Sequence, residues 1–348
     1  MTDLKYIEVN SFMDICDINF KLEKNNLKEI KDKSSVYVGP VELREFSKLL
    51  HIIDGKFVLV SGSSDNTNYK DNFDSYEDFE KFISNDKIIH WFCQNSIVKH
   101  PKITNLPIGL CYDTNLSFLN VYYKEGEKIN SVEQEKILID IKNQSKPFYE
   151  RIPKCYINFI VNTRSPYKYD REEALEFINE DIRFNEIVNQ NRYDCWRNQI
   201  KYAFVASPFG VGLDCLRTWE ALILGCIPIV RSSGIDPLFD DLPVLIVNDW
   251  KEVTEELLNR TINEFKKKKF NYKKLKLKYW KEKIDSYKDS HKFIENFTNN
   301  MQPTRHEFYK TGFYLLVFIF FSLIILKKYN IYNAIKRRFK IFYINYLR

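Results

Sequence analysis

The sequence predicts an α/β protein with two doubly wound parallel-sheet domains in tandem, followed by a hydrophobic membrane segment near its carboxyl end. Short apolar runs, such as those within 56–62 and 88–93, alternate with amphipathic stretches, which is the pattern of strands buried on both faces. The alternation occurs twice, on either side of a polar and turn-rich stretch at 115–150. Two such domains facing each other should bind a ligand at the carboxyl ends of their strands.

The first series spans 1–145 and is expected to form the amino-terminal domain. Strands are expected at 34–39, 56–62 and 88–93. Helices are expected at 41–53, where apolar residues recur at helical spacing, and at 75–84, where Ser75 should cap the first turn.

The second series spans 150–271 and is expected to form the carboxyl-terminal domain. Its apolar runs predict strands at 155–161, 201–207, 226–230 and 243–247, and its amphipathic stretches predict helices at 170–179, at 213–224 and from 252. The stretch 272–300 is helical in pattern and rich in aromatic residues, and it is expected to pack back on the amino-terminal domain.

The distribution of charge argues against a nucleic-acid partner. The chain has a net charge of +6, but the tail after Leu326 holds seven basic residues and no acidic one, so the remaining residues together carry −1. The run Lys266–Lys269 is the one basic cluster outside that tail, and such runs are usually solvated helix faces. The body of the protein therefore offers no track for a polyanion.

The seven cysteines are scattered, and no pair has C-x-x-C spacing. Several stand in apolar runs, as Cys93 does after Trp91 and Phe92. We expect reduced, buried thiols rather than disulfides or a structural zinc site.

A membrane segment is expected at 309–326, followed by a basic tail at 327–348. The run 311–326 has 16 residues without a charge, somewhat short of the roughly 20 that span a bilayer, and Lys327 and Lys328 follow it. A buried terminal helix is the alternative. Because residues 1–10 contain no apolar run, no secretory signal is expected and the body should stay cytoplasmic. The orientation of the segment stays open, and the tail could lie along an anionic surface.

The stretch SPFGVGLDCLRTWEALILGCIPIV, which begins at Ser207, carries the clearest chemical signal. Gly210 and Gly212 allow unusual φ angles and close backbone approach between a strand and a helix. The unpaired N–H groups at the start of that helix would suit a phosphate. Gly225 is expected to end the helix as its C′ residue.

Three charged residues, Asp214, Arg217 and Glu220, recur at spacings that place them on one stripe of the otherwise apolar helix expected at 213–224. Charges on so apolar a helix are costly unless they face a cleft or pair locally. One interpretation gives Arg217 to a diphosphate and Glu220 to ribose hydroxyls. The alternative is an intrahelical pair between Asp214 and Arg217. Arg164 and Arg171, in and after the loop that follows 155–161, could add a second cation.

The same stretch resembles the carboxyl-terminal motif of exostosin-like glycosyltransferases, in which S-P-x-G is followed by Arg, Glu-Ala and G-C-I-P. The blocks at 57–66, 88–95, 106–110 and 157–175 also look familiar for this family. The resemblance implies a GT-B fold of two facing Rossmann-like domains, with the acceptor on the amino-terminal domain, the nucleotide-sugar on the carboxyl-terminal domain, and catalysis without a metal or other cofactor. The donor-binding residues are then expected to be Asn162, Arg164, Arg171, Ser207, Gly210, Gly212, Asp214, Arg217 and Glu220.

A transferase that inverts needs a base for the acceptor hydroxyl, and the candidates are Asp65, which follows the strand at 56–62, and His90, in the strand at 88–93. Asp65 could equally be a turn residue, and His90 a histidine of the core.

The sequence thus predicts a metal-independent glycosyltransferase, transferring a hexose or pentose from a nucleotide-sugar to a glycan or glycoconjugate. The alternatives are a catalytically inert, membrane-tethered protein that binds nucleotide-sugars or glycans on the same fold, and an unrelated Rossmann-like enzyme.

Overall fold

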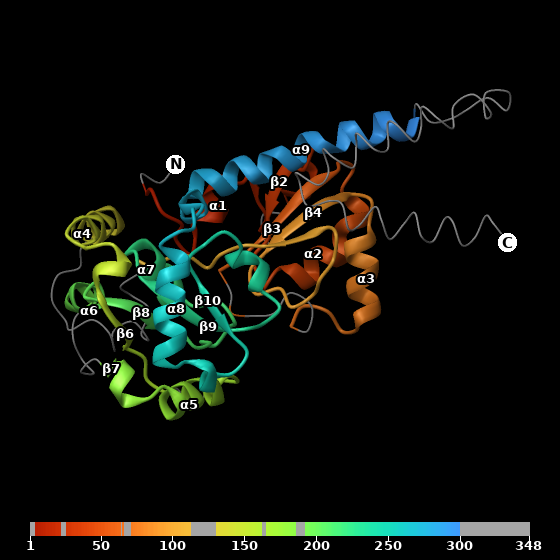
Figure 1. Cartoon of the computed structure of the whole chain (residues 1–348). Coiled ribbons are helices and arrows are strands. Elements are labelled where there is room, and N and C mark those ends of the chain that lie inside the picture. The colour runs from red at the N-terminus through yellow and green to blue at the C-terminus, as the bar shows by residue number, and fades with distance from the viewer. Residues whose placement is uncertain are drawn as a thin grey trace, which may run out of the picture. The chain divides into compact units, whose positions relative to one another are not determined.

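Two five-stranded parallel sheets carry the described part of the fold, which a computed structural model gives for residues 4–21, 26–63, 65, 71–112, 130–161, 165–185 and 192–299 (Figure 1). Side chains are described as far as Lys288. The chain divides into two compact units, Met1–Lys288 and Asp289–Arg348, and both sheets belong to the first unit.

The amino-terminal sheet follows the order of the chain. Its strands are β1 (Ile18–Asn19), β2 (Ser34–Tyr37), β3 (Phe57–Ser61), β4 (Ile88–Cys93) and β5 (Ile103–Asn105). Because neighbouring strands succeed one another in one direction, this sheet has no point at which the strand order reverses. The expected doubly wound topology is therefore wrong for this half. Its strands are parallel as expected, and β2, β3 and β4 are deeply buried.

Helices cover both faces of the amino-terminal sheet. Helices α2 (Leu43–Leu49) and α3 (Tyr76–Ser84) pack on one face, where Phe46, Phe79 and Trp91 share a buried cluster. Right-handed crossovers that always step in the same direction place their helices on the same side. The other face is covered by α1 (Ser11–Ile15) and by α9 (Leu277–Asn299), whose Trp280 meets Phe12 edge to face.

The carboxyl-terminal sheet has the order β10-β9-β8-β6-β7 and is doubly wound. Its strands are β6 (Ile152–Ile157), β7 (Arg183–Asn185), β8 (Tyr202–Ala206), β9 (Ile227–Arg231) and β10 (Leu245–Val247). From β6 the chain first adds β7 on one side and then returns to add β8 on the other side. The strand order therefore reverses between β6 and β8, and such a switch point is where open α/β sheets bind ligands.

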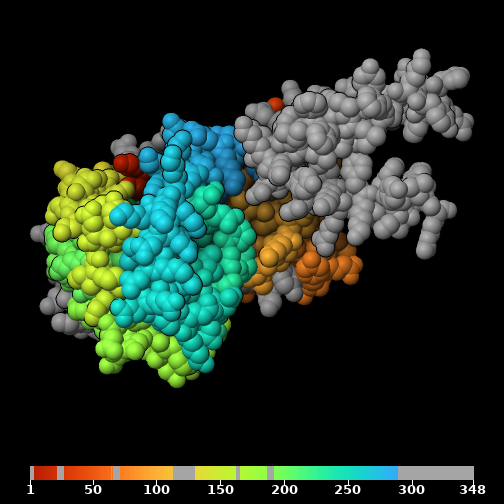
Figure 2. Space-filling view, viewed as in Figure 1, coloured from red at the N-terminus to blue at the C-terminus, as the bar shows by residue number. Residues whose placement is uncertain are grey.

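The remaining helices surround this second sheet (Figure 1). They are α4 (Ser131–Asn143), α5 (Lys168–Phe177), α6 (Arg192–Gln199), α7 (Leu216–Ile223) and α8 (Glu255–Phe265). Short 3₁₀ turns lie at Asn26–Glu29, Leu50–Ile52, Phe148–Glu150 (η4), Glu180–Ile182, Asp236–Phe239, Trp250–Glu252 and Tyr272–Leu275. Leu258 of α8 is buried, while its charged residues form an exposed face at the surface (Figure 2, cyan).

Two helix ends that the sequence predicts are confirmed. The Ser75 side chain accepts a hydrogen bond from the Asp78 N–H at 3.1 Å and caps α3. Gly225 has a φ of +77° after α7. Its N–H donates to the Leu222 carbonyl, and the N–H of Cys226 donates to the Ala221 carbonyl, as in a Schellman motif.

All seven cysteines are free thiols in the structure. Within the part of the chain that is described, no helix is long and apolar enough to cross a membrane. The expected membrane segment at 309–326 and the tail at 327–348 lie outside the described residues.

Candidate functional site

The carboxyl ends of β6 and β8 define the candidate site. The chain leaves β6 through Asn158 and Phe159, and it leaves β8 through Ser207. Both ends stand beside the switch point of the doubly wound sheet, and open α/β sheets in general bind their ligands at such a point.

The loop after β8 is fixed by hydrogen bonds on several sides. Ser207 Oγ lies 2.8 Å from Thr218 Oγ1 of α7, and the Ser207 N–H donates to the Ile229 carbonyl. Ser165 Oγ donates to the Gly210 carbonyl at 2.6 Å. The loop is therefore preorganised, because its backbone is held by neighbouring elements rather than by solvent.

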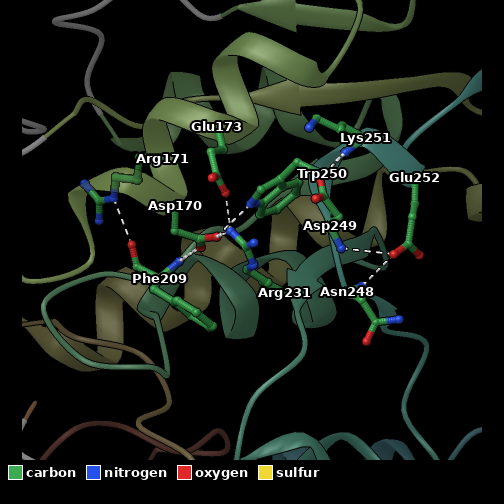
Figure 3. A network of polar contacts seen from close by, with 10 residues as sticks. All are labelled: Asp170, Arg171, Glu173, Phe209, Arg231, Asn248, Asp249, Trp250, Lys251 and Glu252. Atoms are coloured by element: carbon green, nitrogen blue, oxygen red, sulfur yellow. Dashed lines mark hydrogen bonds and ion pairs between the residues drawn. The ribbon is translucent and has the colours of Figure 1, made fainter.

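Asp170 of α5 anchors the same loop through hydrogen bonds and an ion pair (Figure 3). Its fully buried carboxylate accepts hydrogen bonds from the Phe209 N–H at 2.8 Å, from Trp250 Nε1 at 2.7 Å and from Arg231 at 3.2 Å. Arg231 also forms an ion pair with Glu173. The sequence analysis missed this role, since an aspartate near the start of a helix has an ordinary explanation in the helix dipole.

Arg217 of α7 reaches the end of β6. Its Nε donates to Asn158 Oδ1 at 2.8 Å, its Nη1 lies 3.4 Å from the Sγ of Cys215, and its guanidinium stands 5.3 Å from the centre of the Phe159 ring. The residue is only 8% exposed. Ion pairs among the described residues engage other arginines, such as Arg192 and Arg231, but not Arg217. A buried cation without a counter-charge is costly, so this position favours an anionic ligand.

Arg171 of α5 also lies near the Phe159 ring. Its Nε donates to the Phe209 carbonyl at 3.0 Å, its Nη1 donates to the Ile160 carbonyl at 2.7 Å, and its guanidinium is 5.9 Å from the Phe159 ring centre. The structure thus brings together two of the arginines that the sequence offered as cations. Asn158 and Phe159, which hold them there, were missed because the expected strand continued through both.

Asp214 does not share a helical stripe with Arg217 and Glu220. Helix α7 begins at Leu216, so the expected helix start at 213 is wrong and Asp214 lies in the preceding loop. Its carboxylate accepts hydrogen bonds from the Ile108 N–H at 2.7 Å and from Trp219 Nε1 at 2.9 Å. Burial raises its pKa to about 7, although these N–H donors oppose the shift. The alternative pair with Arg217 is not formed either.

Asp214 therefore joins the loop to the amino-terminal half. Ile108 follows β5, and the Asp214 N–H also donates to Asn95 Oδ1 at 2.8 Å, just after β4. Its expected contact with the donor does not fit this arrangement, because both oxygens already serve protein donors.

Glu220 of α7 contacts Arg192 of α6. Its Oε1 accepts hydrogen bonds from Arg192 Nη2 at 2.6 Å and from Arg192 Nε at 3.1 Å. Its side chain is 14% exposed. The expected contact of Glu220 with ribose hydroxyls stays a prediction.

Neither Gly210 nor Gly212 has a positive φ, so the expected unusual backbone angles are not present. Gly212 is instead required for close packing. A Cβ at this position would lie 2.9 Å from Asn95 Nδ2 and 3.0 Å from the Asp65 carbonyl. At Gly210 the nearest atom would be 3.7 Å away, on Arg171, which is ordinary contact.

Asp65 lies beside this glycine, where the Gly212 N–H hydrogen-bonds its carboxyl. Burial of the carboxyl raises the pKa of Asp65, more than this hydrogen bond lowers it, although the residue as a whole is exposed. A carboxylate with a raised pKa next to a ligand loop has the properties of a general base.

His90 has a different environment from the one expected of a base. It lies within β4, is 3% exposed, and hydrogen-bonds Thr104 Oγ1 at 2.8 Å. Its ring packs 4.1 Å from that of Tyr287 of α9. Burial lowers the pKa of His90 to about 3. The structure therefore places it in the core under α9, in agreement with the alternative reading, and we do not retain it as a base.

Asn162 and Arg164 lie outside the described residues. Within the described part, no group of three or more histidine, cysteine, aspartate or glutamate side chains is placed to hold a metal ion.

No family model matches this chain, and no curated protein matches it. The resemblance to exostosin-like enzymes therefore stays a prediction. Among solved structures, it is similar to a trehalose-6-phosphate protein from E. coli bound with UDP-2-fluoro glucose, with 8% identity, a TM-score of 0.34, and coverage of 78% of this chain and 75% of the other.

Two further structures have a similar relation to it. The first is an α,α-trehalose-phosphate synthase (UDP-forming) from Burkholderia xenovorans in complex with glucose-6-phosphate, with 12% identity, a TM-score of 0.34, and coverage of 85% and 78% of the two chains. The second is an α,α-trehalose 6-phosphate synthase from Burkholderia multivorans, with 10% identity, a TM-score of 0.32, and coverage of 82% and 76%.

Proposed function

We propose that this protein is a glycosyltransferase that binds a nucleotide-sugar at the switch point between β6 and β8. The observation that carries the proposal is the buried guanidinium of Arg217, which has no ion-pair partner among the described residues and lies, like that of Arg171, near the Phe159 ring. The diphosphate of a nucleotide-sugar is an anion that guanidinium groups bind well.

The same two arginines would act in the reaction. Transfer breaks the bond between the anomeric carbon and the diphosphate oxygen and forms a bond to the acceptor oxygen, so negative charge grows on the departing diphosphate. Arg217 would stabilise this charge electrostatically, in the role that a divalent cation has in other enzymes. We therefore propose transfer without a metal ion, with Asp65 as the base that receives the proton of the acceptor hydroxyl.

The proposals on the enzyme subtype and on membrane attachment rest on the sequence. The motif that starts at Ser207 supports an exostosin-like hexosyl- or pentosyltransferase, acting on a glycan or glycoconjugate. The uncharged run 311–326 supports a membrane anchor at the carboxyl end, with the folded body on the cytoplasmic side.

An inert binding protein is the second candidate. The burial of His90 favours it, since a transferase that inverts needs a base. Of the two expected bases, Asp65 alone lies near the loop.

A thermal-shift screen with UDP-, GDP- and CMP-sugars tests the donor site. A ligand at a hundredfold excess over its dissociation constant stabilises the folded state by about 2.7 kcal/mol. Arg217→Ala should abolish this shift, because it removes the guanidinium and leaves Asn158 without its donor. Arg197→Ala is the matched control, since Arg197 is exposed and pairs only at the surface with Asp194. A wild-type chain that responds to no nucleotide-sugar contradicts the proposal.

A second experiment distinguishes an enzyme from an inert binding protein. Asp65→Asn should keep the donor-induced shift but lower turnover, measured as release of nucleoside diphosphate, by about 10²-fold or more. If the wild type binds a donor and releases no product with any glycan acceptor, the protein is a binding protein.

A further inference from the structure

A surface of lysines and tyrosines lies where α8 ends. Lys266, Lys267, Lys268 and Lys269 follow α8 directly and are all exposed, as is Lys273. Tyr149 and Tyr272 are 39% and 42% exposed. We call this the lysine–tyrosine surface, made of Tyr149, Lys266–Lys269, Tyr272 and Lys273.

Aromatic contacts hold these residues together, although they come from segments far apart in the sequence. The Nζ of Lys266 stands 4.7 Å from the centre of the Tyr149 ring, in the turn η4. The ring of Phe265 contacts that of Phe270 at 5.2 Å, and Phe270 in turn contacts Tyr272 at 6.3 Å. The Nζ of Lys268 also lies 5.3 Å from the centre of the Phe265 ring, so two lysines of the surface rest on aromatic rings.

The charge of this surface is not neutralised within the described part of the chain. Ion pairs near this segment engage Lys278, Lys281 and Lys288, but none of the five lysines of the surface. Glu150 and Glu264 are exposed nearby, so the local balance remains strongly positive. Outside the tail the chain has a net charge of −1, which makes this surface a local concentration of positive charge.

We propose that the lysine–tyrosine surface docks on an anionic lipid bilayer. Lysines near a bilayer are attracted by its negative surface potential, and exposed tyrosines suit the headgroup level, where one end of the ring is apolar and the other is wet. The uncharged run 311–326 and the basic tail of the same chain also have the chemistry of membrane-binding segments. Stable attachment to a membrane generally takes more than one such segment or surface.

The lysine–tyrosine surface lies away from the candidate site, so the protein could dock on a membrane without covering that site. Turn η4 immediately precedes β6, and α8 ends on the same side, so the surface lies at the amino ends of the strands. The candidate site lies at the carboxyl ends. Docking through the lysine–tyrosine surface therefore leaves the site open to a soluble donor.

The test compares the full chain with a variant in which Lys266, Lys267, Lys268 and Lys269 are all changed to glutamine. Sedimentation with phosphatidylcholine vesicles, with and without phosphatidylserine, measures binding. We expect the preference for phosphatidylserine to fall by at least about tenfold, because each lysine near an anionic surface contributes roughly a factor of five. Salt should weaken the preference of the wild type more than that of the variant.

The matched control changes four exposed lysines of the amino-terminal half, Lys31, Lys48, Lys81 and Lys99, to glutamine, so the net charge falls equally. It should keep the preference. If the Lys266–Lys269 variant behaves like this control, the basic tail alone accounts for anionic binding and the proposal is wrong. If the wild type binds no vesicles but binds heparin in solution, and the Lys266–Lys269 variant loses that heparin binding, the surface binds a polyanion instead and the proposal is wrong. Both variants should retain the thermal shift with the donor, so failure here is separate from failure of the proposed function.

Discussion

At the scale of single residues, ion pairing separates buried arginines that look alike in the sequence. Arg192 pairs with Glu220, and Arg231 pairs with Asp170 and Glu173, whereas among the described residues Arg217 has Asn158 and a thiol as polar partners but no carboxylate. The partners come from other helices and strands, at separations of up to 61 residues. Local spacing therefore identifies Arg217 as a candidate, but only the fold shows that its charge remains uncompensated.

His90 is a sequence candidate that the fold places in the core, and its lowered pKa predicts how stability depends on pH. The folded-state pKa of about 3 lies below the ordinary value of 6.5, so between these values the unfolded chain binds a proton that the folded chain excludes. Lys283, His100 and Lys102 add to the effect of burial. The stabilising contribution is complete above pH 6.5 and decreases as the pH falls toward 3, by up to about 1.4 kcal/mol per pH unit.

Urea unfolding across this pH range measures the effect. His90→Gln removes the titrating group and can keep the hydrogen bond to Thr104, so the free energy of unfolding should depend less steeply on pH by about one proton. His51→Gln is the control, because it makes the same substitution at an exposed histidine. Equal slopes for all three proteins would show that His90 is accessible to protons in the folded state.

At the scale of elements, the two ends of α7 differ in how far the sequence determines them. The carboxyl end was predictable because Gly225 supplies a positive φ locally. The start was not, because Leu213 and Asp214 fit a helical pattern and Cys215 provides no side-chain cap. Asp214 is drawn out of the helix by its bonds to Ile108 and Trp219, which are tertiary contacts.

The two glycines of the preceding loop, Gly210 and Gly212, differ in how closely other atoms approach them. Gly212→Ala should lower the free energy of unfolding by about 1–3 kcal/mol, because the added methyl overlaps the Asp65 backbone and Asn95. Gly210→Ala should change it by less than about 0.5 kcal/mol, since no atom lies closer than 3.7 Å and φ is not positive. Urea denaturation of both variants is the measurement. Equal effects would mean that the loop does not pack against the amino-terminal half as described.

At the scale of the whole molecule, the sequence predicts which strands are buried but not their order. Apolar runs such as those of β3, β4, β8 and β9 predict strands of a parallel sheet, because both faces of such a sheet are covered and its strands are apolar throughout. Their order depends on which connection crosses which neighbour, and no local pattern records that. The same reason limits prediction of the site, because Ser207 and Arg217 share one motif, whereas Asn158 and Asp170 join them only through the fold.

Helix α9 gives the last prediction, because its first part belongs to the core of the unit Met1–Lys288. Trp280 and Ile284 are almost fully buried, and Tyr287 packs on Phe92 of β4. A chain ending at Lys288 keeps these described side-chain contacts and is therefore the reference for a shorter chain.

A chain ending at Lys276 loses this cover and exposes one face of the amino-terminal sheet. Losing a single buried tryptophan costs about 3–5 kcal/mol, and a typical domain has only about 5–15 kcal/mol in total. We therefore expect this shorter chain to be largely unfolded without denaturant, as measured by tryptophan fluorescence and circular dichroism. Trp280→Ala in the full chain is the milder comparison and should unfold at lower urea while remaining folded in water. If the chain ending at Lys276 is as stable as the one ending at Lys288, α9 is an appendage rather than part of the core.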